Sequence, residues 1–322
     1  MLNHGFLIIL ILHINRDFTA WSYNPWIYNG TTPEIEKILN GRCLEYKLFD
    51  PNSRNPSLFV DVDCDIVGGK FKNSFAYKDS CTDKFDESSY DEFFNVVNNK
   101  KSLNNQALFW SGIKGFAHDY SHIKDGVYTL EDTFSGYLIN DLSWCGCKPK
   151  TPDCIDGVNY VRCNKSCNSP SDSFWSRASR TFAENANGTA YVMVNGSTAE
   201  NITAYYNGSY FGKIELPTLG KMKKVNLLIV LVVFNLDNEP KEKCGKGSLV
   251  NLVSDAKKYG LNVQCKDKPS DTLFLLCAKY PQARECVKMS NDAGKLIWSK
   301  ILFVLITISV IFTMFPDFYE DV

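Results

Sequence analysis

Twelve cysteines constrain the fold of this 322-residue chain more than any other feature. An even number of cysteines in an exported protein implies a disulfide framework, because an oxidising compartment favours disulfides over thiolate-bound metal. The spacing of Cys145 and Cys147 is not that of a zinc knuckle, and the four histidines show no ligand arrangement, so we expect no metal site. The cysteines allow up to six disulfides, and they stand at positions 43, 64, 81, 145, 147, 154, 163, 167, 244, 265, 277 and 286.

Both ends of the chain have the character of processing signals. Gly5–Ile14 is apolar but too short to span a bilayer, and small residues follow it at Ala20 and Ser22, so we predict a signal peptide over 1–22. Residues 301–315 are apolar and no basic flank follows them, which favours a removable GPI-anchor signal over 291–322. We expect attachment at Ser290 or Asn291, and hence a lipid-anchored protein on the extracellular face of the plasma membrane. A retained single-pass helix is the alternative.

Six N-glycosylation sequons also indicate an extracellular glycoprotein. They begin at Asn29, Asn164, Asn187, Asn195, Asn201 and Asn207. The formal net charge of -1 argues against nucleic acid as a partner, since a general nucleic-acid binder carries a strong basic excess.

Helical signals dominate the first part of the chain. Thr32 is expected to cap a helix that has Pro33 at its first position and runs towards Cys43. Ser89 and Glu92 have the spacing of a capping box before an apolar run.

Strand signals dominate from residue 107 onwards. Ala107–Trp110, Tyr191–Val194 and the apolar run Val225–Phe234 are predicted strands, the last buried on both faces as in a parallel sheet. A helix over Ser248–Tyr259 and a strand over Leu261–Cys265 complete a βαβ unit. No G-x-G-x-x-G follows a strand, so a Rossmann dinucleotide site is not indicated.

These patterns predict a mixed α/β, disulfide-rich fold with two domains. Residues 23–103 and 129–186 are expected to form a mainly helical domain, and residues 104–128 and 187–290 a domain with a small parallel sheet flanked by helices. Ligands bind at the carboxyl ends of parallel strands, which points to Trp110 and Ser111. A core position for Trp110 is the plainer interpretation.

The segment Thr129–Gly146 gathers Glu131, Asp132 and Asp141 together with aromatic residues and Cys145. A neighbouring Glu and Asp usually mark the start of a helix, here with Thr129 as the N-cap, because acidic side chains favour the positive end of a helix. The alternative is that the segment contributes to an active site.

Four segments together resemble the ADP-ribosyl cyclase family of surface NAD glycohydrolases and cyclic-ADP-ribose hydrolases. They are LFWSGIK from Leu108, TLEDTFSGYLINDLSWCG from Thr129, SFWSRASRTFAE from Ser173 and YFGKIE from Tyr210, and the similarity extends from about Thr32 to Cys286. The TLEDT…WCG block is highly specific for this family.

The resemblance implies roles for particular residues. Glu215 matches the catalytic glutamate, Glu131 the glutamate that orients the nicotinamide amide, and Trp175 a cleft tryptophan. Contacts with substrate are implied for Trp110, Ser111, Lys114, Asp132, Asp141, Ser179, Tyr210 and Phe211. NAD and NADP are then substrates, and no cofactor is expected. A homodimer stays open.

The resemblance also implies a disulfide pattern. The implied pairs are Cys43–Cys64, Cys81–Cys167, Cys145–Cys163, Cys244–Cys265 and Cys277–Cys286, with Cys147 and Cys154 left for an additional bridge. Exchanged partners among the cysteines at 145, 147, 154 and 163 stay open. A further cysteine pair of the family is replaced here by Asn104 and Asn187, and Gly112 stands where vertebrate members have arginine.

The activity expected from this resemblance is extracellular hydrolysis of the nicotinamide–ribose bond, giving nicotinamide and ADP-ribose or its 2′-phosphate. Glu215 would stabilise an oxocarbenium-like intermediate. Tyr210 favours some cyclisation, because the family tends to have an aromatic residue there in efficient cyclases, whereas Glu131 favours hydrolysis. A predominant ADP-ribosyl cyclase and a non-catalytic surface receptor are the alternatives.

Overall fold

The computed structural model describes residues 30–49, 62–97, 102–164, 167, 170–197, 202–234, 236 and 240–290. The predicted signal peptide, the predicted anchor signal, Asn29, Asn201 and Asn291 lie outside these residues. Within them, no helix is both long enough and apolar enough to cross a membrane.

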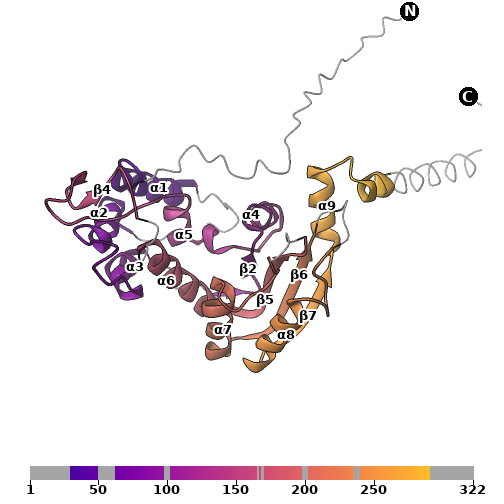
Figure 1. Cartoon of the computed structure of the whole chain (residues 1–322). Coiled ribbons are helices and arrows are strands. Elements are labelled where there is room, and N and C mark those ends of the chain that lie inside the picture. Colours follow the sequence, from indigo (N-terminus) through magenta and orange to yellow (C-terminus); the bar gives the residue numbers. More distant parts are fainter. Residues whose placement is uncertain are drawn as a thin grey trace, which may run out of the picture.

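The fold is mixed α/β, with a mainly helical group at one end of the molecule and the main sheet with its own flanking helices at the other (Figure 1). The helical end contains α1 (Ile35–Phe49), α2 (Cys64–Phe75), the 3-10 turn η2 (Glu87–Tyr90), α3 (Asp91–Val97) and α5 (Phe134–Ile139). Helix α6 (Pro170–Asn185) connects this end with the sheet (Figure 1).

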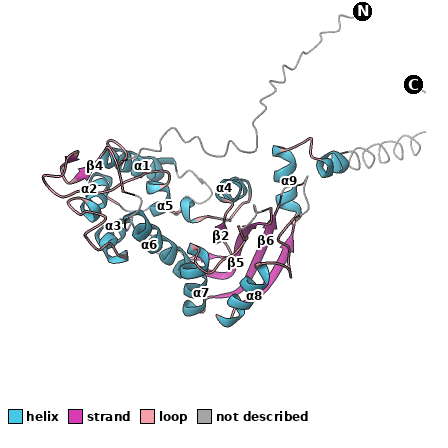
Figure 2. Cartoon of the chain, viewed as in Figure 1, coloured by secondary structure: helices cyan, strands magenta, loops and turns pink. Residues whose placement is uncertain are grey.

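The main sheet is parallel throughout and has β5 near its middle (Figure 2). Both β1 (Leu103–Asn104) and β2 (Leu108–Ser111) pair with β5 (Ala186–Asn195), which also pairs with β6 (Val225–Val233). Strand β7 (Asn262–Asp267) pairs with β6. A separate antiparallel pair is formed by β3 (Cys154–Ile155) and β4 (Val158–Asn159).

The predicted βαβ unit is confirmed, because α8 (Leu249–Lys258) joins β6 to its parallel neighbour β7. Successive side chains of a strand point to opposite faces. Val192 and Val194 of β5 therefore lie in the large core, whereas Met193 packs in a second cluster with Phe116 of α4 (Lys114–Ile123) and Leu276 of α9 (Ser270–Lys279). Burial on both faces, as predicted for β6, applies to its carboxyl half, Val230–Val233, while its first half is partly exposed.

Both predicted helix starts in the first part of the chain were wrong. Helix α1 begins at Ile35 after Glu34, which has φ 55°, and the Thr32 hydroxyl instead accepts a hydrogen bond from the Ser143 amide. The capping box predicted at Ser89 and Glu92 is formed by Asp86 and Ser89. In both places another backbone amide donates to the hydroxyl that was expected to cap the helix: that of Ser143 at Thr32 and that of Asp86 at Ser89.

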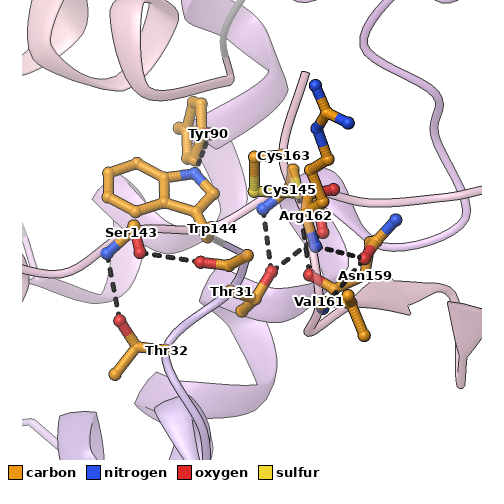
Figure 3. Close-up of a disulfide and its surroundings, with 11 residues drawn as sticks. Thr31, Thr32, Tyr90, Ser143, Trp144, Cys145, Asn159, Val161, Arg162 and Cys163 are labelled. Carbon is orange, nitrogen blue, oxygen red and sulfur yellow. Dashed lines mark hydrogen bonds between the residues drawn. A yellow bond between two sulfur atoms is a disulfide. The ribbon is translucent and has the colours of Figure 1, made fainter. Parts of the chain in front are cut away.

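All six disulfides that the resemblance implies or leaves room for are present. Besides the five implied pairs, Cys147–Cys154 closes a loop of sequence separation 7. Figure 3 shows how Cys145–Cys163 joins a wider network: the Thr31 hydroxyl donates to the Cys145 carbonyl at 3.0 Å and accepts from the Cys145 amide at 2.9 Å. The end of Thr129–Gly146, which we call the acidic segment, is thereby attached to the start of the described chain.

An aromatic core anchors the same segment from its other side. The indole of Trp144 donates to the Tyr90 hydroxyl at 2.9 Å and packs edge-on against Phe71 and Phe174. Trp144 is 3% exposed, so the segment enters the helical core directly after its last carboxylate.

Asparagines occupy two places of note on β5. Asn104 and Asn187, which by the resemblance replace a cysteine pair of the family, are direct register partners on β1 and β5. Of the predicted glycosylation sites within the described residues, Asn164 and Asn207 are exposed, whereas Asn187 and Asn195 are half-buried on β5.

Candidate active site

Segments far apart in the sequence meet around the carboxyl end of β2. Trp110 and Ser111 are its last residues, and α4 (Lys114–Ile123) follows at once. The 3-10 turn η3 (Leu130–Asp132) supplies Glu131, α6 supplies Trp175 and Ser179, and the π-helical turn η4 (Phe211–Glu215) supplies Glu215. Gly112 follows Ser111 with φ 67°, a conformation that glycine adopts without strain.

Glu215 is a buried carboxyl group at the end of η4, where α7 (Leu216–Met222) begins. Burial raises its pKa to about 8, and the negative charge of Glu131 acts in the same direction. The Ser179 hydroxyl opposes both effects with a hydrogen bond to this carboxylate. Glu215 is therefore mostly protonated at neutral pH when no cation lies beside it.

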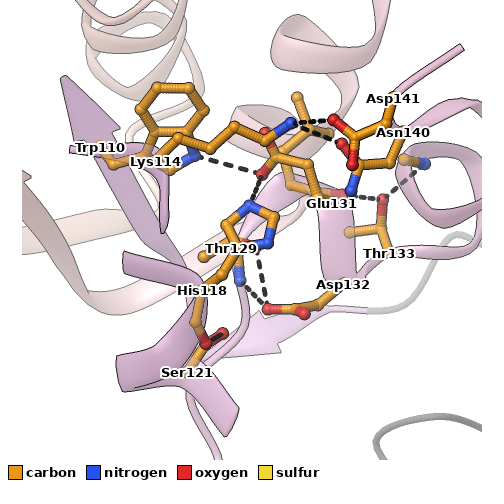
Figure 4. A network of polar contacts seen from close by, with 12 residues as sticks. Trp110, Lys114, His118, Ser121, Thr129, Glu131, Asp132, Thr133, Asn140 and Asp141 are labelled. Atoms are coloured by element: carbon orange, nitrogen blue, oxygen red, sulfur yellow. Dashed lines mark hydrogen bonds and ion pairs between the residues drawn. The ribbon is translucent and has the colours of Figure 1, made fainter. Parts of the chain in front are cut away.

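Glu131 has the opposite character. Its Oε2 accepts a hydrogen bond from the Trp110 indole at 3.2 Å, and Nε2 of His118 lies 3.3 Å away, placed better for an ion pair than for an aligned hydrogen bond (Figure 4). Burial by itself would raise the pKa of Glu131, but His118 and Trp110 outweigh it and the pKa is lowered. One buried carboxyl group thus holds its proton and its neighbour stays ionised, a division of states typical of catalytic pairs.

One face of α4 contacts three carboxylates of the acidic segment. Lys114, His118 and His122 are four residues apart and so lie on the same face of the helix. Lys114 Nζ contacts Asp141 Oδ1 at 3.0 Å, His118 contacts Glu131, and His122 Nε2 lies 3.6 Å from Asp132 Oδ1.

Asp132 closes the turn that presents Glu131. Its Oδ2 accepts hydrogen bonds from the Thr129 amide at 2.7 Å and the Thr129 hydroxyl at 2.9 Å. Thr129 therefore stands at the expected N-cap position, but of a 3-10 turn and with Asp132 as the acceptor. A hollow in the described part of the molecule is lined by Asp132 but by neither Glu131 nor Glu215. Asp132 thus has a structural task, and its contact with substrate stays a prediction.

Close backbone approach holds η3 against α5. A Cβ on Gly136 would lie 2.1 Å from the Leu130 carbonyl oxygen and 2.8 Å from the Glu131 Cα. Only glycine lets α5 approach the backbone of Glu131 so closely, which explains this residue within the acidic segment.

Asp141 is held at the exposed end of the same segment. It has φ 60°, and Lys114 bridges it to the Asn140 side chain, with Nζ 2.7 Å from Asn140 Oδ1. Arg42 of α1 donates to the carbonyls of Leu138 at 2.9 Å and Asn140 at 2.8 Å. Lys114 is therefore engaged by Asp141, and a substrate phosphate would have to share it.

The aromatic residues that were predicted to contact substrate differ in how far their side chains are buried. Trp175 is partly buried and packs edge-on against Phe174 at 5.1 Å between ring centroids, and Tyr210 is also partly buried. Phe211 is 1% exposed and its ring packs against Phe109, so its side chain belongs to the core. Binding by Phe211, if it occurs, would use its backbone.

Sequence reasoning missed His118, which contacts Glu131 directly. The detectable signal was the i, i+4, i+8 spacing of Lys114, His118 and His122 directly after a strand and before an acidic segment. It also missed Asp172 of α6, which accepts a hydrogen bond from the Tyr210 hydroxyl at 3.1 Å. In the part of the chain that the structure describes, no group of three or more His, Cys, Asp or Glu residues is placed to hold a metal ion.

Comparison with known proteins shows similarity over most of the chain. The model of the ADP-ribosyl cyclase family matches residues 32–286. The ADP-ribosyl cyclase/cyclic ADP-ribose hydrolase of Aplysia kurodai is 38% identical over 261 residues, 79% of this chain and 87% of the relative. The mouse (Mus musculus) ADP-ribosyl cyclase/cyclic ADP-ribose hydrolase 1 is 33% identical over 284 residues, 87% of this chain and 86% of the relative.

Solved structures of the same family also resemble this chain. Aplysia cyclase complexed with its substrate NGD and its product cGDPR matches with a TM-score of 0.70 and 36% identity, covering 80% of this chain and 98% of that one. Porcine CD38 complexed with a covalent intermediate, ribo-F-ribose-5′-phosphate, matches with a TM-score of 0.65 and 29% identity, covering 76% and 99% of the two chains.

Proposed function

Because this chain belongs to the ADP-ribosyl cyclase family, we propose that it cleaves the nicotinamide–ribose bond of NAD and of NADP. Hydrolysis to ADP-ribose or its 2′-phosphate is the main outcome, and cyclisation is minor. The observation that carries this proposal is the pair of buried carboxyl groups, Glu215 with a raised pKa and Glu131 with a lowered one.

Glu215 suits the charge that develops during this cleavage. Breaking a glycosidic bond passes through an oxocarbenium-like state, and a carboxylate beside the anomeric carbon stabilises it. The nicotinamide ring of the substrate is cationic, so its arrival favours the ionised form of Glu215. Nicotinamide leaves as a neutral molecule with the bonding electron pair, so no strong general acid is needed. The covalent intermediate of the porcine relative supports such a two-stage course.

Trp110 and Trp175 suit the binding of a flat cation. The face of each indole offers cation–π attraction of about 0.5 to 2 kcal/mol. Trp110 is fixed by its hydrogen bond to Glu131, and Trp175 by Phe174. An ionised Glu131 can accept a hydrogen bond from the nicotinamide amide, which orients the leaving group and favours water as the second nucleophile.

A predominantly cyclising enzyme is the second candidate. Tyr210 favours it, because an aromatic side chain at the site offers a face for a folded adenine ring, and the relatives are named for both activities. A non-catalytic receptor gives no reason to bury two carboxyl groups with opposed pKa shifts.

Nicotinamide release from NAD and NADP tests the proposal. The secreted form, from about residue 23 to residue 290, should release nicotinamide, and Glu215→Ala should reduce kcat by at least about a hundredfold. Glu92→Ala is the matched control, because Glu92 is an exposed glutamate on α3. Full activity in Glu215→Ala would sink the mechanism, and chromatography of the products separates the hydrolase from the cyclase.

We further propose that the enzyme acts outside the cell and is held to the membrane by a GPI anchor near Ser290. The twelve cysteines, all paired in the structure, support an oxidising compartment. Release of activity from intact cells by a phosphatidylinositol-specific phospholipase tests the anchor. Activity that stays on the cells after treatment would favour a membrane helix.

A further inference from the structure

Tyr210 is held by contacts at its hydroxyl and at its ring. Its hydroxyl donates to Asp172 Oδ1 at 3.1 Å, and Nζ of Lys213 lies 4.8 Å from the centre of its ring. Tyr210 is partly buried, and it directly precedes η4, the turn that ends in Glu215. A hydrogen bond to a carboxylate is stronger than one between neutral groups, so Asp172 restricts the rotation of this ring.

Asp172 stands on the face of α6 that carries two site residues. Trp175 and Ser179 follow it at i+3 and i+7, so the three side chains share one face of the helix. Ser179 bonds to Glu215 at one end of η4, and Asp172 bonds to Tyr210 at the other. Trp175 therefore lies between two hydrogen bonds, one from α6 to the end of η4 and one to Tyr210 directly before it, roughly 10 Å apart along the helix.

We propose that Asp172 is a positioning residue that sets the balance between cyclic and hydrolysed product by fixing the ring of Tyr210 at the start of η4. The inference rests on the proposed function, since it concerns the second half of that reaction. It assigns a task to a carboxylate that acts through Tyr210.

Two nucleophiles compete once nicotinamide has left with the electron pair of its bond to C1′. Water can bond to C1′ and lose a proton, which gives ADP-ribose. Alternatively, a ring nitrogen of the adenine bonds to C1′ and the adenine then loses a proton, which gives a cyclic product. An aromatic ring held in a fixed orientation at the site excludes water from the space it fills and offers a surface for the purine. Both properties weaken when the ring is free to turn away.

The test measures cyclic product per nicotinamide released, so that changes in turnover do not affect the comparison. It uses the full chain expressed on eukaryotic cells, with NAD and with an NAD analogue that fluoresces on cyclisation. Asp172→Ala should lower the cyclic fraction at least about threefold, because the Tyr210 hydroxyl loses its hydrogen-bond acceptor. Asp172→Asn, which keeps an acceptor oxygen, should restore most of it.

Tyr210→Phe separates a positioning effect from a general structural one. It keeps the ring but removes the donor, so it should lower the cyclic fraction, and Asp172→Ala added to it should have no further effect. Asp65→Ala, which removes a first-turn aspartate of α2, should leave the fraction unchanged.

The possible failures are distinguishable. Absence of nicotinamide release by the unmodified chain would overturn the proposed function itself. Three other results would overturn the role of Asp172 alone. The first is nicotinamide release with an unchanged cyclic fraction in Asp172→Ala. The second is an equal effect of Asp172→Ala in the Tyr210→Phe background, and the third is no cyclic product from either dinucleotide.

Discussion

The hydrogen bond from Ser179 to Glu215 predicts a specific change in the pH dependence of the enzyme. It is the contact that lowers the pKa of Glu215 against burial and the charge of Glu131. A hydrogen bond to a charged group contributes about 1.5 to 3 kcal/mol, and one pKa unit corresponds to about 1.4 kcal/mol. Ser179→Ala should therefore raise the pKa of Glu215 from about 8 by roughly one to two units.

The consequence for activity follows from the ionised fraction. With a pKa of about 8, about a tenth of Glu215 is ionised at pH 7, and an increase of one unit leaves about a hundredth. We expect kcat/KM of Ser179→Ala at pH 7 to fall at least about tenfold, and the deficit to shrink as the pH rises through the new pKa.

The assay is nicotinamide release at low substrate concentration between pH 5.5 and 10, since kcat/KM reports the ionisation of the free enzyme. Ser173→Ala is the matched control, because it makes the same change on another face of α6. The reasoning would be refuted by a Ser179→Ala profile that coincides with the unmodified one, or by a loss of the same factor at every pH.

Three further predictions concern stability and the neighbouring carboxylate. Folding raises the pKa of Glu215 from 4.5 to about 8, so the stability that this residue contributes is full below pH 4.5 and is lost as the pH rises towards 8. Glu215→Gln, which cannot ionise, should therefore raise the free energy of unfolding by roughly 3 kcal/mol at pH 7 and by little at pH 4.5. Chemical denaturation at the two pH values measures this difference. His118→Gln should raise the pKa of Glu131 and move any acidic transition in the product ratio to higher pH; an unmoved transition would show that His118 does not tune this group. Gly136→Ala should destabilise the protein by about 1 to 3 kcal/mol, because its Cβ would meet the Leu130 carbonyl; unchanged denaturation would contradict this.

Local patterns were informative wherever the physical cause is itself local. The apolar run that forms β6, the amphipathic helix α8 and the following strand were predictable, because strand alternation and helix periodicity reflect burial within a few residues of sequence. The helix starts at Ile35 and Glu87 were not, because the polar side chains near them bond to groups that spacing did not indicate.

Motif resemblance brought Glu215, Glu131 and Trp110 to attention although they are far apart in the sequence. It could not reveal that the Trp110 indole bonds to Glu131, or that His118 completes the surroundings of this carboxylate. Those contacts depend on how α4 packs beside η3, and a helix periodicity states which residues share a face without stating what that face meets.

By itself, the sequence determined the disulfide-rich α/β class and the parallel βαβ unit, because these depend on residue type and short-range order. The candidate catalytic residues came from its resemblance to a known family. Only the tertiary structure decided how the cysteines at 145, 147, 154 and 163 pair, and that Glu215 holds a proton while Glu131 stays ionised. The reason is physical: a pKa is set by burial and by charges brought from other segments, and neither exists until the chain has folded.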